Sequence, residues 1–244
     1  MTVPHALEPM SPSSLVIFDC DGVLVDSEPL QIQALLDVAA PLGFSMPLVA
    51  AVERFRGAKM ADIVAAVEGQ MGSAVQPDFV ARVRARQAEV FARELRAVDG
   101  VREAILAIPL ARCVASSGPL EKIRLSLAIT GLLDLFGDNL FSAYAIGRWK
   151  PDPGLFLHAA ARMGVAPADC VVVEDSVLGV QAGVAAGMRV LGYADEARGA
   201  SLAAAGAEVF VAMRELPDRI LGRARRRRLL RRALEWMRRP WSGP

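Results

Sequence analysis

The 244-residue chain has few of the side chains on which many enzyme classes depend. Its histidines are His5 and His158 alone, which argues against a histidine-based metal centre or an acid–base apparatus built on histidine. The cysteines Cys20, Cys113 and Cys170 are odd in number and lack metal-ligand spacing. They therefore predict reduced thiols in a cytoplasm and not a disulfide framework. Catalytic chemistry in this chain has to depend on carboxylates.

Long apolar runs and targeting signals are also missing from the sequence. No apolar stretch reaches the roughly 20 residues that a membrane-spanning helix needs. Residues 1–13 lack the basic and apolar regions of a secretory signal, and we expect them to form a disordered leader. These features predict a cytoplasmic protein without a transmembrane segment.

The net charge of +1 hides an uneven distribution of charge along the chain. The segment from Arg219 to Pro244 contains ten arginines and one acid, whereas the preceding 218 residues carry 18 basic and 26 acidic side chains. We expect residues 218–244 to form a basic tail that packs on the acidic body or on another subunit. Docking to nucleic acid or to an anionic membrane is the alternative.

Two carboxylates follow the first apolar run of the chain. Leu15 to Phe18 read as a buried strand of a parallel sheet, and Asp19, Asp21 and Gly22 come directly after it. Residues two apart share a face of a strand, so both acids are predicted to point into one crevice at the strand end, where α/β proteins bind ligands. A bound cation or a shared proton would offset the free-energy cost of burying two negative charges side by side. The alternative is a solvated turn or a helix cap.

The remaining pattern predicts an α/β protein with an inserted helical unit. Helices are expected at 29–41, 47–55, 59–70 and 77–96, and no strand is expected there. Beyond Asp99-Gly100, strands alternate with helices near 119–129, 153–163 and 176–186, and the strands are expected at 112–115, 139–142, 170–173, 188–192 and 209–211. This alternation predicts a Rossmann-like parallel sheet with helices on both faces. The core then comprises 14–25 and 98–217, and the four-helix cap comprises 26–97.

Three further segments place polar groups where predicted strands end. Ser116 and Ser117 precede a helix and can bind an anion, although an ordinary helix cap has the same composition. Lys150 stands before two prolines in a rigid loop, either as a fixed cation or as a solvated surface lysine. Glu174 and Asp175 end another apolar strand, and a second acid pair favours magnesium, although Asp175 could instead cap a helix.

These segments, in this order, resemble the haloacid dehalogenase superfamily of phosphotransferases over about residues 14–217. The matching stretches are DCDGVLVDSE from Asp19, VASSGP from Val114, KPDP from Lys150 and VEDSVLGV from Val173. The subgroup is similar to the sugar-phosphate phosphatases and β-phosphoglucomutase. Within it, three stretches resemble bacterial enzymes that hydrolyse 6-phosphogluconate: ERFRGAKMADI from Glu53, VASSGP from Val114 and LFSAYAIGRWKPDPGLFLHAAARMG from Leu140.

The resemblance implies a role for each matching residue in a Mg²⁺-dependent phosphatase. Asp19 is then the nucleophile that forms an aspartyl-phosphate, and Asp21 is the general acid and base. Ser116, Ser117 and Lys150 are implied to bind the phosphate. Magnesium is implied to be bound by the side chains of Asp19, Glu174 and Asp175 and by the Asp21 backbone carbonyl. The presence of Asp21 also argues against dehalogenase chemistry, which needs no acid for an alcohol leaving group.

The cap residues bear on the substrate. Gln31 stands where β-phosphoglucomutase carries a cap histidine, which favours hydrolysis over a mutase reaction. Arg56 and Lys59 beside Gly57 are predicted to bind the distal end of a phosphorylated sugar or sugar acid such as 6-phosphogluconate, with a solvated helix start as the alternative. A non-catalytic adaptor acting through the basic tail is the other class of function, and the intact set of acids argues against it.

Overall fold

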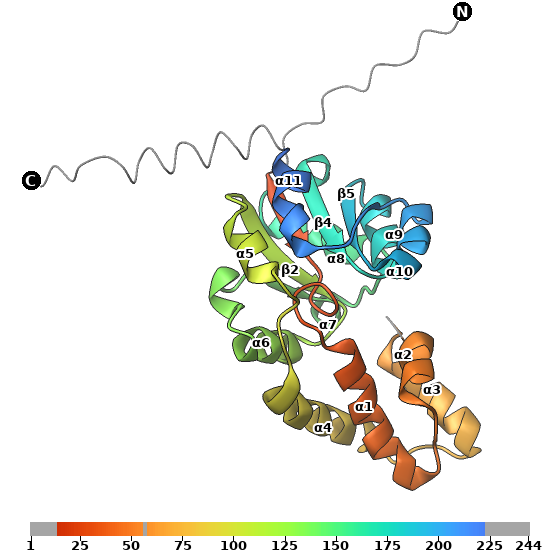
Figure 1. Cartoon of the computed structure of the whole chain (residues 1–244). Helices are drawn as coiled ribbons and strands as arrows, with labels where there is room; N and C mark the ends of the chain where they lie inside the picture. The colour runs from red at the N-terminus through yellow and green to blue at the C-terminus, as the bar shows by residue number, and fades with distance from the viewer. Residues whose placement is uncertain (1–13, 56–57, 223–244) are drawn as a thin grey trace, which may run out of the picture.

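The centre of the fold is a six-stranded parallel sheet with strand order β3-β2-β1-β4-β5-β6. Figure 1 labels β2, β4 and β5 of this sheet. The computed structural model describes residues 14–55 and 58–222. The order reverses between β1 and β4, which is the point where open α/β sheets bind ligands. The strands are β1 (Leu15–Phe18), β2 (Ala111–Ser116), β3 (Leu140–Ser142), β4 (Cys170–Glu174), β5 (Arg189–Tyr193) and β6 (Glu208–Phe210).

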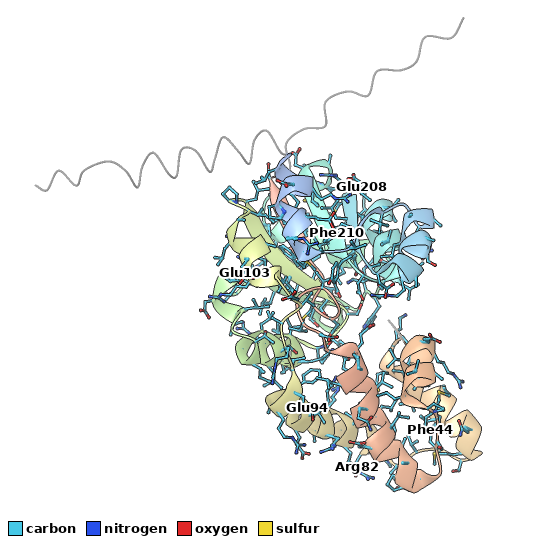
Figure 2. All side chains as sticks on the ribbon, in the orientation of Figure 1. Phe44, Arg82, Glu94, Glu103, Glu208 and Phe210 are labelled. Atoms are coloured by element: carbon cyan, nitrogen blue, oxygen red, sulfur yellow. The ribbon has the colours of Figure 1, made fainter. Side chains whose placement is uncertain are left out.

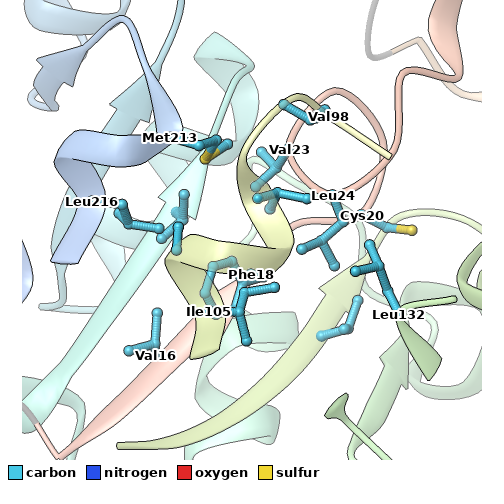
Figure 3. Close-up of a cluster of buried hydrophobic side chains, with 14 of the residues drawn as sticks. Val16, Phe18, Cys20, Val23, Leu24, Val98, Ile105, Leu132, Met213 and Leu216 are labelled. Carbon is cyan, nitrogen blue, oxygen red and sulfur yellow. The ribbon is translucent and has the colours of Figure 1, made fainter. Parts of the chain in front are cut away.

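Strand β1 is buried on both faces because helices cover each side of the sheet. Val16 and Phe18 pack into the cluster shown in Figure 3, under α5 (Val101–Leu106), α6 (Leu120–Ile129) and α11 (Leu216–Leu221). Leu15 and Ile17 pack on the other face, under α8 (Gly154–Arg162), α9 (Val177–Ala185) and α10 (Glu196–Ala204). The apolar run of β1 therefore has the composition of a doubly covered strand, as predicted.

Four helices form a cap with a core of its own beside the sheet (Figure 1). They are α1 (Glu28–Ala39), α2 (Leu48–Phe55), α3 (Met60–Met71) and α4 (Phe79–Glu94). Their buried cluster includes Leu35, Phe44 and Phe79, and Figure 2 shows Phe44 in the cap, well apart from Phe210 of the sheet. The predicted parallel core with an inserted four-helix cap is confirmed.

The chain crosses between core and cap through two segments that lie side by side. Val25 forms a β-bridge with Ala97, and the amide of Asp26 donates to the Arg96 carbonyl at 3.0 Å. The Val98 amide donates to the carbonyl of Leu24 at 3.0 Å. The insertion thus begins and ends in one hydrogen-bonded ribbon, and the predicted division at residues 26 and 97 falls within it.

Several short elements complete the described part of the chain. Helices α5, α10 and α7 (Ala143–Ile146) were not predicted. Short 3₁₀ segments occur at Ala40–Leu42, Leu133–Leu135, Pro167–Asp169 and Met213–Glu215. The predicted leader lies outside the described residues, as does most of the tail, whose first residues instead belong to α11 with Ile220 and Leu221 buried. Among the described helices, none is long and apolar enough to cross a membrane.

We expect Ile17→Ala to destabilise the fold because Ile17 is fully buried in the central strand. The free energy of unfolding should fall by about 2–5 kcal/mol, from lost burial and the cavity left behind. The control is Val49→Ala on α2, because Val49 is 73% exposed and should change stability by less than about 0.5 kcal/mol. Denaturant unfolding measures both variants, and equal effects would contradict the assignment of β1 as the buried centre of the sheet.

Candidate active site

The two predicted acid pairs meet at the carboxyl ends of adjacent strands. Phe18 of β1 is in register with Val173 of β4, and the Asp19 amide donates to the Val173 carbonyl at 2.9 Å. A cavity of about 140 Å³ opens at this edge of the sheet. Its polar lining includes Asp19, Asp21, Ser116, Ser117, Lys150 and Asp175. The structure therefore brings residues predicted from four separate segments to one cavity.

Lys150 is a buried cation at the base of this cavity. Its side chain forms ion pairs with Glu174 and with Asp19, where the Nζ–Oδ1 distance is 2.6 Å. Burial lowers the pKa of Lys150, but the charges of Asp19 and Glu174 outweigh burial and raise that pKa above its usual value. Lys150 is 7% exposed, so the alternative of a solvated surface lysine is wrong.

Glu174 is held in place by hydrogen bonds as well as by Lys150. Its Oε2 accepts from the amides of Asp175 and Ser176 and from the Ser176 hydroxyl, each at 2.9 Å. Ser176 also caps α9, because its Oγ accepts from the Gly179 amide at 3.0 Å. The capping role that Asp175 could have taken therefore belongs to Ser176. Gly179 is needed here, since a side chain at this position would collide with the Glu174 carboxylate.

The acids at the strand ends fit a divalent cation. Carboxylate oxygens of Asp19, Glu174 and Asp175 all lie within 4.8 Å of one another, and all three residues are buried. Burial, together with the charges of Glu174 and Asp21, raises the pKa of Asp19 to about 7 in spite of Lys150. A bound cation would relieve this excess of negative charge, and hard oxygen donors suit Mg²⁺. Gly22 has a φ of +78° and lies against Asp175, so any side chain at position 22 would collide with the Asp175 carboxylate.

Asp21 faces different partners from those of Asp19. Its Oδ1 accepts from Ser27 Oγ at 2.5 Å and from Gln31 Nε2 at 2.8 Å, and Lys122 forms an ion pair with its Oδ2 at 2.8 Å. Burial raises the pKa of Asp21, but Lys122 and the hydrogen bonds outweigh burial and hold that pKa below its usual value. The Asp21 carboxylate lies outside the three-acid group. A metal contact through the Asp21 backbone carbonyl stays a prediction.

The serines lie on the opposite side of the cavity, at the end of β2. Ser116 is buried, and its Oγ accepts from the Gly118 amide at 3.0 Å. The Ser142 hydroxyl donates to the Gly118 carbonyl at 2.6 Å, which fixes the loop from the neighbouring strand. Both Ser116 and Ser117 line the cavity, as the sequence predicts. A hydroxyl and loop amides beside a helix start can bind an anion.

Apolar cap side chains close the cavity from the other side. They come from α1, α2, α3 and α4 and include Ile32, Leu35, Phe55, Ile63 and Val83. A second cavity of about 490 Å³ adjoins the first between α4 and α6, and both cavities are lined by Gln31, Met60 and Ser117. Room for a substrate therefore exists beyond the predicted phosphate site, under the cap.

Lys59 takes part in a contact between cap and core. Its Nζ lies 5.8 Å from the ring centroid of Trp149, while its neighbours Ala58 and Met60 line the cavity. Trp149 packs edge-to-face on Tyr144 at 5.4 Å. Arg84 of α4 lies over Tyr144, with 5.6 Å between Cζ and the ring centroid. Two cap cations thus contact two core aromatics. Arg56 and Gly57 lie outside the described residues.

Two cations at the site were missed by sequence reasoning. Lys122 of α6 reaches Asp21 across 101 positions of sequence, and Arg198 of α10 lies 3.6 Å from Asp175 Oδ2. Arg198 belongs to a helix with no clear apolar period, and the sequence carries no signal for it. For Lys122 the sequence does contain one signal, the rarity of lysine: the chain has only three lysines, and each could have been considered as a site residue.

Comparison with known proteins places this site in a family. The family model for haloacid dehalogenase-like hydrolases matches residues 14–187. The 6-phosphogluconate phosphatase of Escherichia coli K12 is 36% identical over 210 residues, which cover 86% of this chain and 95% of that protein. Hexitol phosphatase B of the same organism is 37% identical over 179 residues, covering 71% and 80%.

A solved structure has a similar overall fold. It is a conserved haloacid dehalogenase-like protein of unknown function from Agrobacterium tumefaciens, with a TM-score of 0.75 and 34% identity. The alignment covers 87% of this chain and 99% of that one. The strand order, the acids at the ends of β1 and β4, and these similarities agree, and the chain belongs to the haloacid dehalogenase-like hydrolase family.

Proposed function

We propose that this hydrolase is a Mg²⁺-dependent phosphoric monoester hydrolase that acts on a small phosphorylated sugar or sugar acid through an aspartyl-phosphate. The observation that carries the proposal is the single cavity that Asp19, Asp21, Ser116, Lys150 and Asp175 line together. Positioning and charge neutralisation are the main requirements of phosphoryl transfer, and this cavity supplies both. The phosphatase relatives support the reaction class.

Asp19 is the proposed nucleophile. Lys150 donates a hydrogen bond to Asp19 Oδ1 and so fixes the orientation of this carboxylate at the carboxyl end of β1. Attack by an Asp19 oxygen on phosphorus forms the aspartyl-phosphate while the bond to the substrate alcohol breaks. Lys150 would offset charge on both the nucleophile and the phosphate, and Ser116 with the Ser117 amide would bind phosphate oxygens.

Asp21 is the proposed general acid and base. It would give a proton to the departing alkoxide and then take one from the water that hydrolyses the aspartyl-phosphate, so that it ends unchanged. Its pKa is below the usual value in this arrangement. A phosphate anion bound beside it would raise that pKa, and this substrate effect is needed for Asp21 to carry a proton.

Magnesium would be held by Asp19, Glu174, Asp175 and the Asp21 carbonyl. When bound, it supplies charge stabilisation for the phosphoryl group and orients its oxygens. The close group of three buried acids supports this assignment.

The contacts of Gln31 favour hydrolysis over a mutase reaction. Gln31 touches Asp21 and Lys122 at the position where the mutase resemblance requires a histidine. An amide neither gains nor loses a proton near neutral pH, so this position lacks an acid–base group. The adaptor alternative is supported by no observation on the described residues, and the basic tail on which it depends lies mostly outside them.

We further propose that the substrate is a sugar-acid phosphate resembling 6-phosphogluconate. The adjoining cavity of about 490 Å³ offers room for the sugar. Arg56 and Lys59, beside Gly57, remain our proposed ligands for its carboxylate. The similarity to the E. coli 6-phosphogluconate phosphatase supports this substrate. A cytoplasmic location is part of the same proposal, and the three cysteines are free and buried, as reduced thiols would be.

Asp19→Asn is expected to abolish steady-state phosphate release, because an amide cannot serve as the attacking oxygen anion. The near-identical size of asparagine keeps the fold intact. The matched control is Asp138→Asn, which alters a 93% exposed carboxylate paired with Arg124 and should leave the rate unchanged. Turnover by the Asp19 variant would exclude Asp19 as the nucleophile.

Removal of Mg²⁺ by a chelator should stop turnover, and added Mg²⁺ should restore it. Because the cation offsets three buried acids, Mg²⁺ should also raise the melting temperature of the wild-type protein. Thermal unfolding with and without Mg²⁺ gives a readout that is separate from activity. Asp175→Asn should lose most of this shift, and an equal shift in both proteins would place the metal elsewhere.

A panel of sugar phosphates tests the substrate proposal. We expect a higher kcat/KM for 6-phosphogluconate than for neutral hexose and hexitol phosphates of similar size, because the proposed ligands Arg56 and Lys59 would pair with its carboxylate. Lys59→Met should reduce this preference. Arg54→Met removes a neighbouring cation that lies over the Phe55 ring, and it should leave the preference unchanged. A panel in which the neutral substrates win would refute the sugar-acid assignment.

A further inference from the structure

The placement of lysine in this chain is unusual. The chain uses arginine for 25 of its 28 cationic side chains, and its lysines are Lys59, Lys122 and Lys150. Lys150 pairs with Asp19, and Lys122 pairs with Asp21. Two of three lysines therefore contact the two proposed reacting carboxylates. An ammonium is compact and carries three donors, whereas guanidinium is a planar fork, so the two do not substitute for each other at a tight site.

All three donors of the Lys122 ammonium have acceptors. Nζ donates to Asp21 Oδ1 at 2.9 Å, to Asp21 Oδ2 at 2.8 Å and to Gln31 Oε1 at 2.9 Å. An ammonium has three N–H groups, so none is left over for a substrate oxygen in this arrangement. Any contribution of Lys122 to the reaction therefore has to pass through Asp21.

Lys122 also fixes an orientation that the other partners leave open. Ser27 and Gln31 both donate to Oδ1 of Asp21, and Lys122 is the donor to Oδ2 among the contacts within the described residues. The stem of Lys122 reaches Asp21 past Gly118, where a side chain would begin 3.4 Å from Lys122 Cδ. Lys122 comes from α6 of the core, while Gln31 comes from α1 of the cap. Asp21 is thus held from both sides of the cleft.

We propose that Lys122, with Gln31 as its second acceptor, is a positioning residue that aims the Asp21 carboxylate at the leaving-group oxygen. The inference rests on the proposed function, because it assigns Asp21 the transfer of a proton to an alcohol. Lys122 performs no chemistry of its own. Its effect is confined to the steps in which Asp21 transfers a proton, first to the leaving alcohol and later from the hydrolytic water.

The leaving group separates this role from a general structural role. A sugar alkoxide needs a proton as it leaves, whereas p-nitrophenolate leaves without one. The value of kcat/KM covers only the steps up to formation of the aspartyl-phosphate. Lys122→Met should therefore lower kcat/KM for the preferred sugar phosphate by about 10-fold or more, which is a share of the roughly 10²–10⁴-fold that a general acid contributes. For p-nitrophenyl phosphate the change should stay below 3-fold.

Two further measurements guard the interpretation. Arg124→Met removes an exposed ion pair of 2.9 Å from the same helix, and both kcat/KM values should be unchanged in that variant. Lys122 lines the adjoining cavity, but its three N–H groups are taken by Asp21 and Gln31. Competitive inhibition by the dephosphorylated sugar should therefore be equal in wild type and Lys122→Met. Weaker inhibition in the variant would overturn the inference in favour of a direct substrate contact.

The remaining outcomes are also decisive. Equal losses of kcat/KM for both substrates would overturn the positioning role, since such losses indicate damage to phosphate binding or to the fold. Wild-type protein that hydrolyses a different alcohol phosphate would refute the sugar-acid substrate alone, and the same comparison then applies to that alcohol. Wild-type protein without any phosphatase activity would overturn both the proposed function and the role of Lys122.

Discussion

The arrangement of the site depends on one buried ammonium, that of Lys150. It lies between Asp19 after β1 and Glu174 at the end of β4, and so it joins the two central strands at the ligand-binding edge. Three buried carboxylates within 4.8 Å would otherwise repel one another at a cost of several kcal/mol. One cation offsets this repulsion only in part, and a second cation would reduce it further. Burial, together with the charges of Glu174 and Asp21, raises the pKa of Asp19 in spite of Lys150.

The two aspartates after β1 have opposite electrostatic surroundings although they are two residues apart. Asp19 faces other acids and one lysine, and its pKa is raised. Asp21 faces Lys122, a hydroxyl and an amide, and its pKa is lowered. When the surroundings push the pKa values of two neighbouring carboxyl groups apart in this way, the two groups can perform different chemical tasks in one site. Apolar cap side chains line the same cavity, and a low local dielectric strengthens electrostatic effects of this kind.

Much of the fold and of the site could be predicted from the sequence because these features depend on local residue patterns. The apolar run Leu15–Phe18 and the acids that follow it define a strand and its end, and the four cap helices follow from apolar spacing and glycine or proline breaks. The partner of each charged group could not be predicted, because it depends on how distant helices pack. Lys122 and Asp21 are 101 positions apart, and periodicity carries no information about such a contact. Helix α10 was missed because its sequence, EARGASLAA, contains Leu202 as its one large apolar residue and so offers no repeated apolar spacing.

The paired ribbon at residues 24–26 and 96–98 has a consequence for how such proteins can diversify. The segments that enter and leave the cap are hydrogen-bonded to each other. The two points at which an insertion joins the core therefore stay the same, whatever the size or structure of that insertion. Loop closure across such adjacent ends costs little and grows slowly with length. Recombination at this ribbon could therefore exchange the cap as a unit, and with it the substrate preference. The acids and the lysine of the core would keep their positions.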